Sequence, residues 1–281
     1  MAGIGLTVAV PHLAPGPQIT TPLGHAGATA AVLTLSAGAA CCAAWAARVP
    51  AVRFALRLTA AGAAGVAAVL GSATGCVACL AVLLCSLAAG RTRHRGAGLA
   101  ALGAVAVLVT GLTWAVAART VPGGLAAALE ERLTPHRVQL WQDAWHLLRD
   151  DAALGVGPGR FGELSTTSAQ SLMSDGRPHS ASLQQAAEQG IVGVALLAAA
   201  FVWVLYALWR SPRPAPVALT AGAALTAVAV IAAIGNALSF TAVSVGAGLL
   251  AGMATARPLT EEPSSPAPDT RPRGAGRTPA W

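Results

Sequence analysis

Two side chains in the polar middle of this sequence stand out as able to do chemistry, Arg137 and His179. A guanidinium offers a fork of N–H donors that matches the oxygens of a phosphate or diphosphate. An imidazole is the side chain best suited to accept a proton near neutral pH. Arg137 is therefore a candidate anion ligand and His179 a candidate base. A structural role stays open for His179, as a hydrogen-bonding residue before a helix.

Arg137 lies in the first turn of a helix that the sequence predicts from Thr134–Pro135 onward. Threonine is favoured at the N-cap of a helix and proline at its first position. One face of this helix would carry Arg137 together with Trp141 and Trp145. Tryptophan anchors at the level of lipid headgroups, and a helix N-terminus attracts anions. We expect the helix to lie in the membrane interface and bind a lipid diphosphate at Arg137, or else to pack on the protein with Arg137 solvated.

Two neighbouring segments are candidate binding elements as well. Leu154–Phe161 has glycine at every second position, which predicts a tight turn and, less specifically, a phosphate cradle of backbone N–H groups. Pro178–Ser182 precedes an apolar helix, and Ser182 and Gln185 have the spacing of a capping box. Glu188 follows in the early turns of that helix, where the helix dipole favours a carboxylate.

The composition indicates that these segments belong to a membrane protein. Apolar residues make up 55% of the 281 residues and charged residues 10%, too few to solvate a globule of this size. All 18 basic residues are arginines, and twelve of them flank apolar runs in short clusters without interleaved aromatic residues, so we expect no nucleic-acid partner. The five cysteines lie in apolar runs, so we expect neither disulfides nor a metal site, although Cys76 and Cys79 form a CxxC.

The apolar runs predict an all-α, polytopic transmembrane bundle of about seven helices. Uncharged runs long enough to cross the membrane cover residues 26–47, 97–118, 190–209, 217–235 and 237–256. The stretch 58–89 is too long for one helix, so we divide it at Gly71–Gly75. Both flanking arginine clusters, Arg48–Arg57 and Arg91–Arg95, then lie in the cytoplasm, as the positive-inside rule requires.

This topology places the N-terminus outside and the C-terminus inside. We expect an external segment at 1–25, four transmembrane helices in 26–118, an external loop with the candidate active site at 119–188, three transmembrane helices in 189–256 and a disordered cytoplasmic tail at 257–281. Twelve arginines and three acidic residues then lie inside, against six arginines and eight acidic residues outside. The N-terminus lacks the basic stretch of a signal peptide, so we expect no cleaved leader.

The expected membrane spans contain no charged residue or histidine near their centres. Ion-coupled transporters and pumps depend on such groups, so the sequence disfavours a transporter. Asn236, Ser239, Thr241 and Ser244 could line a path, although hydrogen bonds between helices would explain them equally well. We therefore expect binding or chemistry in the external loop, at the membrane surface.

The motifs of this loop resemble those of the O-antigen ligase and polysaccharide polymerase family. The family pattern has an arginine and a tryptophan, then LGxGxGxF, then HNxxLxxxxExGxxG. The matching residues here are Arg137, Trp141, Leu154, Gly155, Gly157, Gly159, Phe161, His179, Leu183, Glu188, Gly190 and Gly193. Their order, their spacing and their position in an external loop agree with the family, and the resemblance covers residues 22–256.

The resemblance implies a glycosyltransferase of the cytoplasmic membrane that needs no metal or other cofactor. Such proteins move a glycan from an undecaprenyl diphosphate carrier to a lipid-anchored sugar or another glycan at the outer face of that membrane. By this resemblance Arg137 would hold the diphosphate, and His179 would orient or deprotonate the attacking hydroxyl. The further residues for which it implies substrate contacts are Trp141, Gly155, Gly157, Gly159, Arg160 and Glu188.

Two departures from the family pattern bear on activity. Family members usually have a Ser-Arg pair in the external turn before the loop, whereas the turn here, Ser72–Gly75, has no arginine. The asparagine that usually follows the histidine is Ser180, and typical members have more membrane helices. The arginines that could supply the missing charge are Arg119, Arg132, Arg160 and Arg177. The alternative to an active transferase is therefore a non-catalytic relative that binds lipid-linked glycan or scaffolds polysaccharide assembly.

Overall fold

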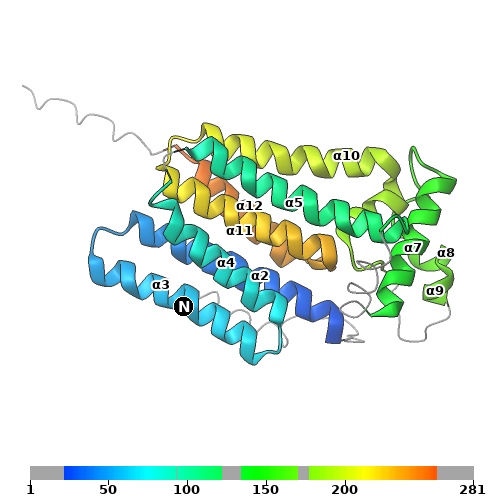
Figure 1. Cartoon of the computed structure of the whole chain (residues 1–281), viewed down its shortest axis with the longest axis horizontal. Helices are drawn as coiled ribbons and strands as arrows, with labels where there is room; N and C mark the ends of the chain where they lie inside the picture. Colours follow the sequence, from blue (N-terminus) through cyan, green and yellow to red (C-terminus); the bar gives the residue numbers. More distant parts are fainter. Residues whose placement is uncertain (1–21, 93, 122–133, 170–176, 258–281) are drawn as a thin grey trace, which may run out of the picture.

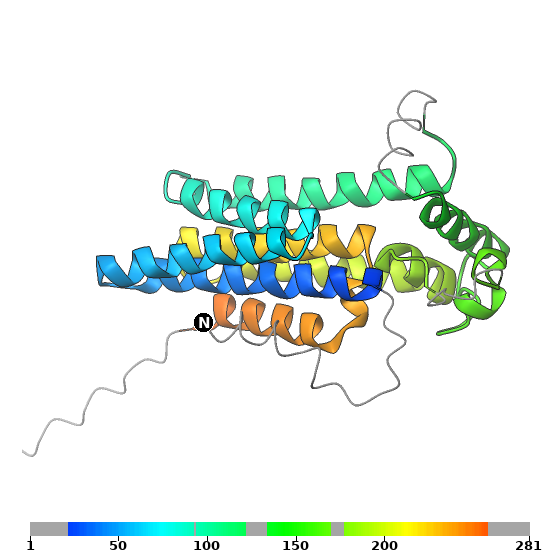
Figure 2. The same ribbon diagram turned by 90° about the horizontal axis from the view of Figure 1, so that it is seen from below.

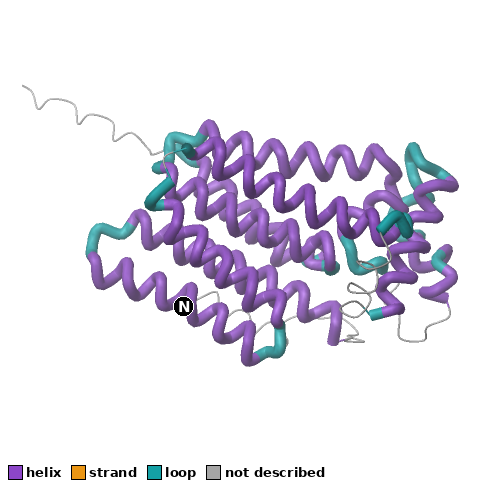
Figure 3. The backbone as a smooth tube through the Cα atoms, in the orientation of Figure 1, coloured by secondary structure: helices purple, strands orange, loops and turns teal. Residues whose placement is uncertain are grey.

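The structure, a computed structural model, describes residues 22–92, 94–121, 134–169 and 177–257, with side chains from residue 26 on. Within these ranges it consists of helices and loops without a strand (Figure 3). The apolar helices of the bundle are α2 (Pro22–Ala46), α3 (Pro50–Val69), α4 (Ala73–Ala89), α5 (Arg95–Ala117), α10 (Ala181–Arg210), α11 (Ala215–Ile234) and α12 (Thr241–Thr255). Three further helices, α7 (Pro135–Asp150), α8 (Phe161–Leu164) and α9 (Thr166–Ala169), lie at one end of this bundle (Figures 1 and 2).

The helices confirm the predicted all-α membrane architecture. Five described helices, α2, α3, α5, α10 and α11, are long and apolar enough to cross a membrane, whereas α4 has 17 residues and α12 has 15. Seven crossings and the orientation of the chain in the membrane therefore stay predictions. The expected external segment at 1–25 and the tail at 257–281 fall almost wholly outside the described side chains.

The helix break predicted at Gly71–Gly75 separates α3 from α4. Gly71 has a φ of +71°, a left-handed conformation that glycine adopts without a steric penalty. The Gly75 N–H donates to the Ser72 hydroxyl at 3.1 Å, so Ser72 caps the start of α4. A glycine turn followed by a serine N-cap thus ends one helix and starts the next within a single apolar stretch.

Helix α11 lies at the centre of the bundle and packs against α2, α4, α5, α10 and α12. Small residues let these helices approach closely. A Cβ added to Gly38 of α2 would collide with Ala224 of α11, and one added to Gly222 would lie 2.7 Å from the Leu99 side chain of α5. Lipid tails are as apolar as the helices, so close packing of small residues, rather than escape from water, stabilises such a bundle.

The arginine-bearing turns gather at the end of the bundle opposite α7 (Figure 1). Arg95, at the start of α5, donates to the carbonyl oxygens of Ser211 at 3.0 Å and Arg213 at 3.2 Å, both after α10. The Ser211 hydroxyl in turn donates to the Ala254 carbonyl of α12 at 2.8 Å. These bonds join the α4–α5 turn, the α10–α11 turn and the end of α12 at one end of the bundle.

We predict that α4 crosses the membrane, because the turns at its two ends belong to opposite ends of the bundle. In a cysteine-free variant, Ala73→Cys in right-side-out membrane vesicles should react with a membrane-impermeant maleimide. Thr92→Cys should react only after the vesicles are permeabilised. Labelling of both positions in sealed vesicles would show that α4 does not cross, and the reverse pattern would invert the predicted orientation.

Candidate functional site

A cavity of about 300 Å³ lies at the end of the bundle that carries α7. Its described lining comes from the start of α2, the turn Gly71–Thr74, Arg137 of α7, His179 before α10, and the segment Ile231–Asn236 at the end of α11. The structure therefore brings together the two side chains that the sequence identifies as the chemical candidates. The volume is at the lower end of the range for ligand sites, about 300–1,000 Å³.

Arg137 occupies the first turn of α7, which begins at Pro135 with Thr134 as N-cap, as predicted. The Thr134 side chain makes no capping hydrogen bond, and the Arg137 side chain is half-buried. Burial lowers the pKa of Arg137, although a guanidinium keeps its proton at neutral pH. Within the described ranges no hydrogen bond or carboxylate satisfies this guanidinium. A half-buried cation on a cavity wall without an acidic partner is suited to an anionic ligand.

The apolar face of α7 fixes the position of Arg137. Trp141 is only 1% exposed and packs in one cluster with Phe161 and Leu183. Trp145 meets Trp114 of α5 edge-on, with ring centroids 6.0 Å apart. Helix α7 thus packs on the protein, yet Arg137 is not simply solvated, because it lines the cavity. Trp141 does not line the cavity, and its predicted substrate contact stays a prediction.

His179 has a φ of +50°, a left-handed conformation that non-glycine residues adopt rarely and at a cost. The backbone after it is held by hydroxyls: Ser180 is the N-cap of α10, and the Trp114 indole N–H donates to the Ser182 hydroxyl at 3.2 Å. The Ser180 and Ser182 hydroxyl oxygens are 3.3 Å apart. The capping box predicted for Ser182 and Gln185 is wrong, because α10 begins at Ala181 and Ser182 bonds to α5 instead.

The glycine-rich loop after α7 packs against a kink in α10. Gly190, with a φ of +64°, breaks that helix. The N–H of Ile191 donates to Ala152 O at 2.9 Å, and the N–H of Val156 donates to Ala187 O at 2.9 Å. A Cβ on Gly190 would collide with the Ala153 carbonyl, so only glycine permits this approach. The loop and the kink thus satisfy each other's backbone groups.

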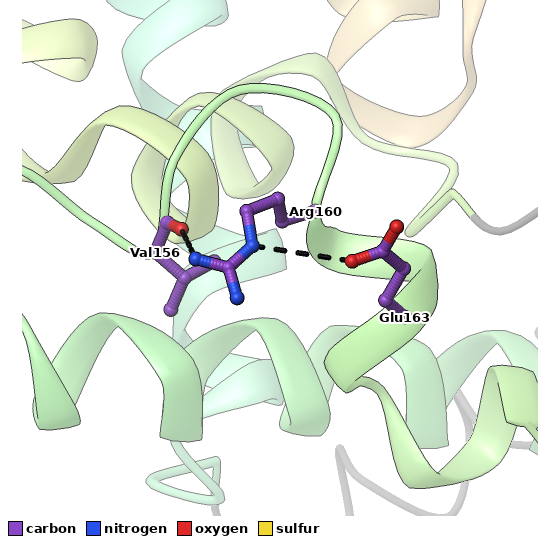
Figure 4. A network of polar contacts seen from close by, with 3 residues as sticks. All are labelled: Val156, Arg160 and Glu163. Atoms are coloured by element: carbon purple, nitrogen blue, oxygen red, sulfur yellow. Dashed lines mark hydrogen bonds and ion pairs between the residues drawn. The ribbon is translucent and has the colours of Figure 1, made fainter.

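The other residues predicted to contact substrate lie outside the cavity lining. Gly155 and Gly157 face the α10 kink, where the Gly157 N–H donates to Glu188 O at 3.0 Å. Arg160 is exposed, donates to Val156 O at 3.3 Å and pairs with Glu163 at 3.9 Å (Figure 4). The residue Glu188 is 8% exposed, and its carboxylate accepts a hydrogen bond from the Gln184 side chain at 3.2 Å.

A Cβ added to Gly159 would meet no described atom within 4 Å, and nothing further marks this glycine as a ligand contact. Substrate binding by Gly155, Gly157, Gly159, Arg160 and Glu188 stays a prediction.

No second arginine in the described part of the chain lines the cavity. Arg119 donates to the Gln142 side chain at 2.6 Å, Arg160 lies in the glycine loop and Arg177 is exposed. Arg132 falls outside the described residues. The turn in which family members usually carry their arginine does reach the cavity, but here its polar residues are Ser72 and Thr74.

Sequence reasoning does not identify Asp143, which organises the segment beyond α7. Its carboxylate accepts hydrogen bonds from the Ser165 hydroxyl at 2.7 Å and from the Thr167 N–H at 3.0 Å, so it caps α9. Burial raises the pKa of Asp143, but these hydrogen bonds lower it by more, and the net pKa lies below its ordinary value. The polar run Ser165–Ser168 is the sequence signal for a helix start that needs such a partner.

Comparison with known proteins shows the family of this chain. A family model described as O-Antigen ligase matches residues 58–198, half of the chain. The chain belongs to the O-antigen ligase family. In this O-antigen ligase family member the matched part runs from α3 into α10 and includes the Gly71–Thr74 turn, Arg137 and His179. No curated protein and no solved structure matches the chain.

Gly190→Ala should destabilise this O-antigen ligase family member much more than Gly159→Ala. Both glycines have positive φ, so either substitution costs about 1–2 kcal/mol of backbone strain. Only Gly190 faces a carbonyl, which adds about 1–3 kcal/mol of overpacking. Thermal unfolding in detergent, followed by tryptophan fluorescence, measures the difference. Equal decreases in Tm for the two variants would contradict the close contact between the glycine loop and α10.

Proposed function

We propose that this protein is a glycosyltransferase that moves a glycan from an undecaprenyl diphosphate carrier to a hydroxyl of a lipid-anchored or glycan acceptor. The site would lie in the external loop at the outer face of the cytoplasmic membrane, with the arginine-bearing turns inside. The observation that carries the proposal is that Arg137 and His179 line the same cavity. Membership of the O-antigen ligase family supports it.

Arg137 would bind the diphosphate of the donor. Negative charge accumulates on the diphosphate oxygens as the bond to the sugar breaks, and a positioned guanidinium stabilises that charge. The half-buried setting supports this role, because charges interact more strongly where water is partly excluded. The packing of Trp141 under α7 would hold the guanidinium in place and avoid reorganisation during the reaction.

His179 would orient the acceptor and take its proton. The acceptor hydroxyl oxygen attacks the anomeric carbon, the bond from that carbon to the diphosphate breaks, and the electron pair leaves with the diphosphate oxygen. The proton of the hydroxyl passes to the imidazole. The strained backbone at His179 supports a functional role, since such conformations persist where the surrounding structure over-determines them.

A non-catalytic relative that binds lipid-linked glycan is the second candidate. The observation that favours it is the turn Gly71–Thr74, which reaches the cavity with hydroxyls where family members usually have an arginine. Arg137 is then the one fixed positive charge among the described lining residues. A single guanidinium can bind a diphosphate, but it stabilises a leaving group less than two would.

Glycan transfer in proteoliposomes tests the proposal. The donor is lipid diphosphate-linked glycan extracted from the source cells, with the acceptor fraction of the same membranes. We expect Arg137→Ala and His179→Ala each to lower the rate by at least about 100-fold. The matched controls are Arg149→Ala and His146→Ala, exposed residues of α7 away from the cavity, which should keep the wild-type rate.

Other outcomes separate the two candidates. Wild-type protein that retains the lipid-linked glycan without transferring it would establish the binding protein instead of the enzyme. Transfer that neither Arg137→Ala nor His179→Ala affects would show that the reaction takes place elsewhere in the protein. Unchanged expression and membrane insertion of each variant exclude a folding defect as the cause of lost activity.

A further inference from the structure

Asn236 is a cavity residue that neither the mechanism nor the family match uses. Helix α11 ends at Ile234, Gly235 continues in extended conformation, and Asn236 precedes the short 3₁₀ helix Ala237–Ser239 that leads into α12. The matched family region ends at residue 198, well before this break. Asn236 lines the same cavity as Arg137 and His179.

Asn236 is nearly buried, and only the oxygen of its side-chain amide has a hydrogen-bond partner in the described part of the chain. The residue is 5% exposed, and its Oδ1 accepts a hydrogen bond from the Ser239 hydroxyl. In the described ranges no acceptor meets the two N–H donors of its Nδ2. This nitrogen is not among the described side-chain atoms that are fully buried without a partner, so its donors are open to the cavity, where a bound molecule can supply the acceptor.

Apart from Arg137 and His179, the polar residues in the described lining of the cavity are neutral: Ser72, Thr74 and Asn236. Ser72 accepts the Gly75 N–H and keeps its own hydroxyl hydrogen for donation, and Thr74 lies two residues further along the same cavity wall. The other described lining residues are small or aliphatic, as at Ala30 and Ile234. Neutral donors set in a weakly apolar wall fit a sugar, which presents hydroxyl or amide oxygens together with C–H faces. A second phosphate would instead call for a second cation.

We propose that Asn236 binds the sugar attached to the diphosphate, so that the site prefers a glycosylated carrier lipid to the bare carrier. The inference rests on the proposed function, in which Arg137 holds the diphosphate. Asn236, in the break between α11 and α12, is then the residue that distinguishes the two lipids. Arg137 binds the diphosphate, which both lipids carry.

Binding to two probes, measured by thermophoresis with the protein in nanodiscs, tests this assignment. One probe is lipid diphosphate-linked glycan extracted from the source cells, and the other is undecaprenyl diphosphate without sugar. Wild type should bind the glycosylated probe about three- to tenfold more tightly, the effect of one or two neutral hydrogen bonds. Asn236→Ala should bring the ratio of the two Kd values close to one. If Asn236→Ala does not fold, Asn236→Leu, which keeps the side-chain volume, is measured in its place.

The controls make the failures distinguishable. Ser244→Ala alters an exposed hydroxyl of α12 outside the cavity and should keep the wild-type ratio. Arg137→Ala should weaken the binding of both probes. If it weakens the binding of neither, the proposed function itself is wrong. If Arg137→Ala weakens both while Asn236→Ala and Asn236→Leu leave the ratio unchanged, only the sugar assignment is overturned. If Asn236→Ala weakens the binding of both probes equally, Asn236 is a diphosphate ligand and the sugar assignment is overturned. Equal Kd values of the wild type for the two probes would also overturn it.

Discussion

A helix bundle in lipid must satisfy its backbone N–H and C=O groups internally, so irregular backbone is tolerated only where protein or a water-filled cavity meets it. In this chain the glycine turn at Gly71, the left-handed His179 and the break at Gly235 all border one cavity. The kink at Gly190 lies nearby, and there the loop after α7 supplies the missing hydrogen-bond partners. The departures from helical geometry therefore create the site.

Each departure contributes a different kind of group to that site. The end of α3 brings hydroxyls, the segment before α10 brings an imidazole, and the end of α11 brings an amide, while α7 adds the guanidinium from outside the bundle. The rest of the bundle is held by close packing around α11, where alanine and glycine let the helices approach one another. The guanidinium and the imidazole of the candidate site thus lie at the end of the bundle where α7 packs.

Local signals in the sequence predict the helices and their ends well. Pro135 at the start of α7 and Gly71–Ser72 at the turn before α4 act within a few residues, so periodicity and capping rules identify them. The N-cap of α10 is predicted wrongly because Ser182 bonds to Trp114, a tertiary contact. That Asn236 and Arg137 line one cavity depends on which helices are neighbours, and the glycine loop faces the α10 kink for the same reason. Neither is encoded in local spacing.

The most direct test of the site is a cryo-electron microscopy structure of the protein with undecaprenyl diphosphate in a lipid nanodisc. The diphosphate should lie in the cavity between α2, the Gly71–Thr74 turn and α7, within hydrogen-bonding distance of the Arg137 guanidinium and next to His179. A diphosphate bound instead at Gly155–Arg160, or at the opposite end of the bundle near Arg95, would contradict the assignment of this cavity as the site.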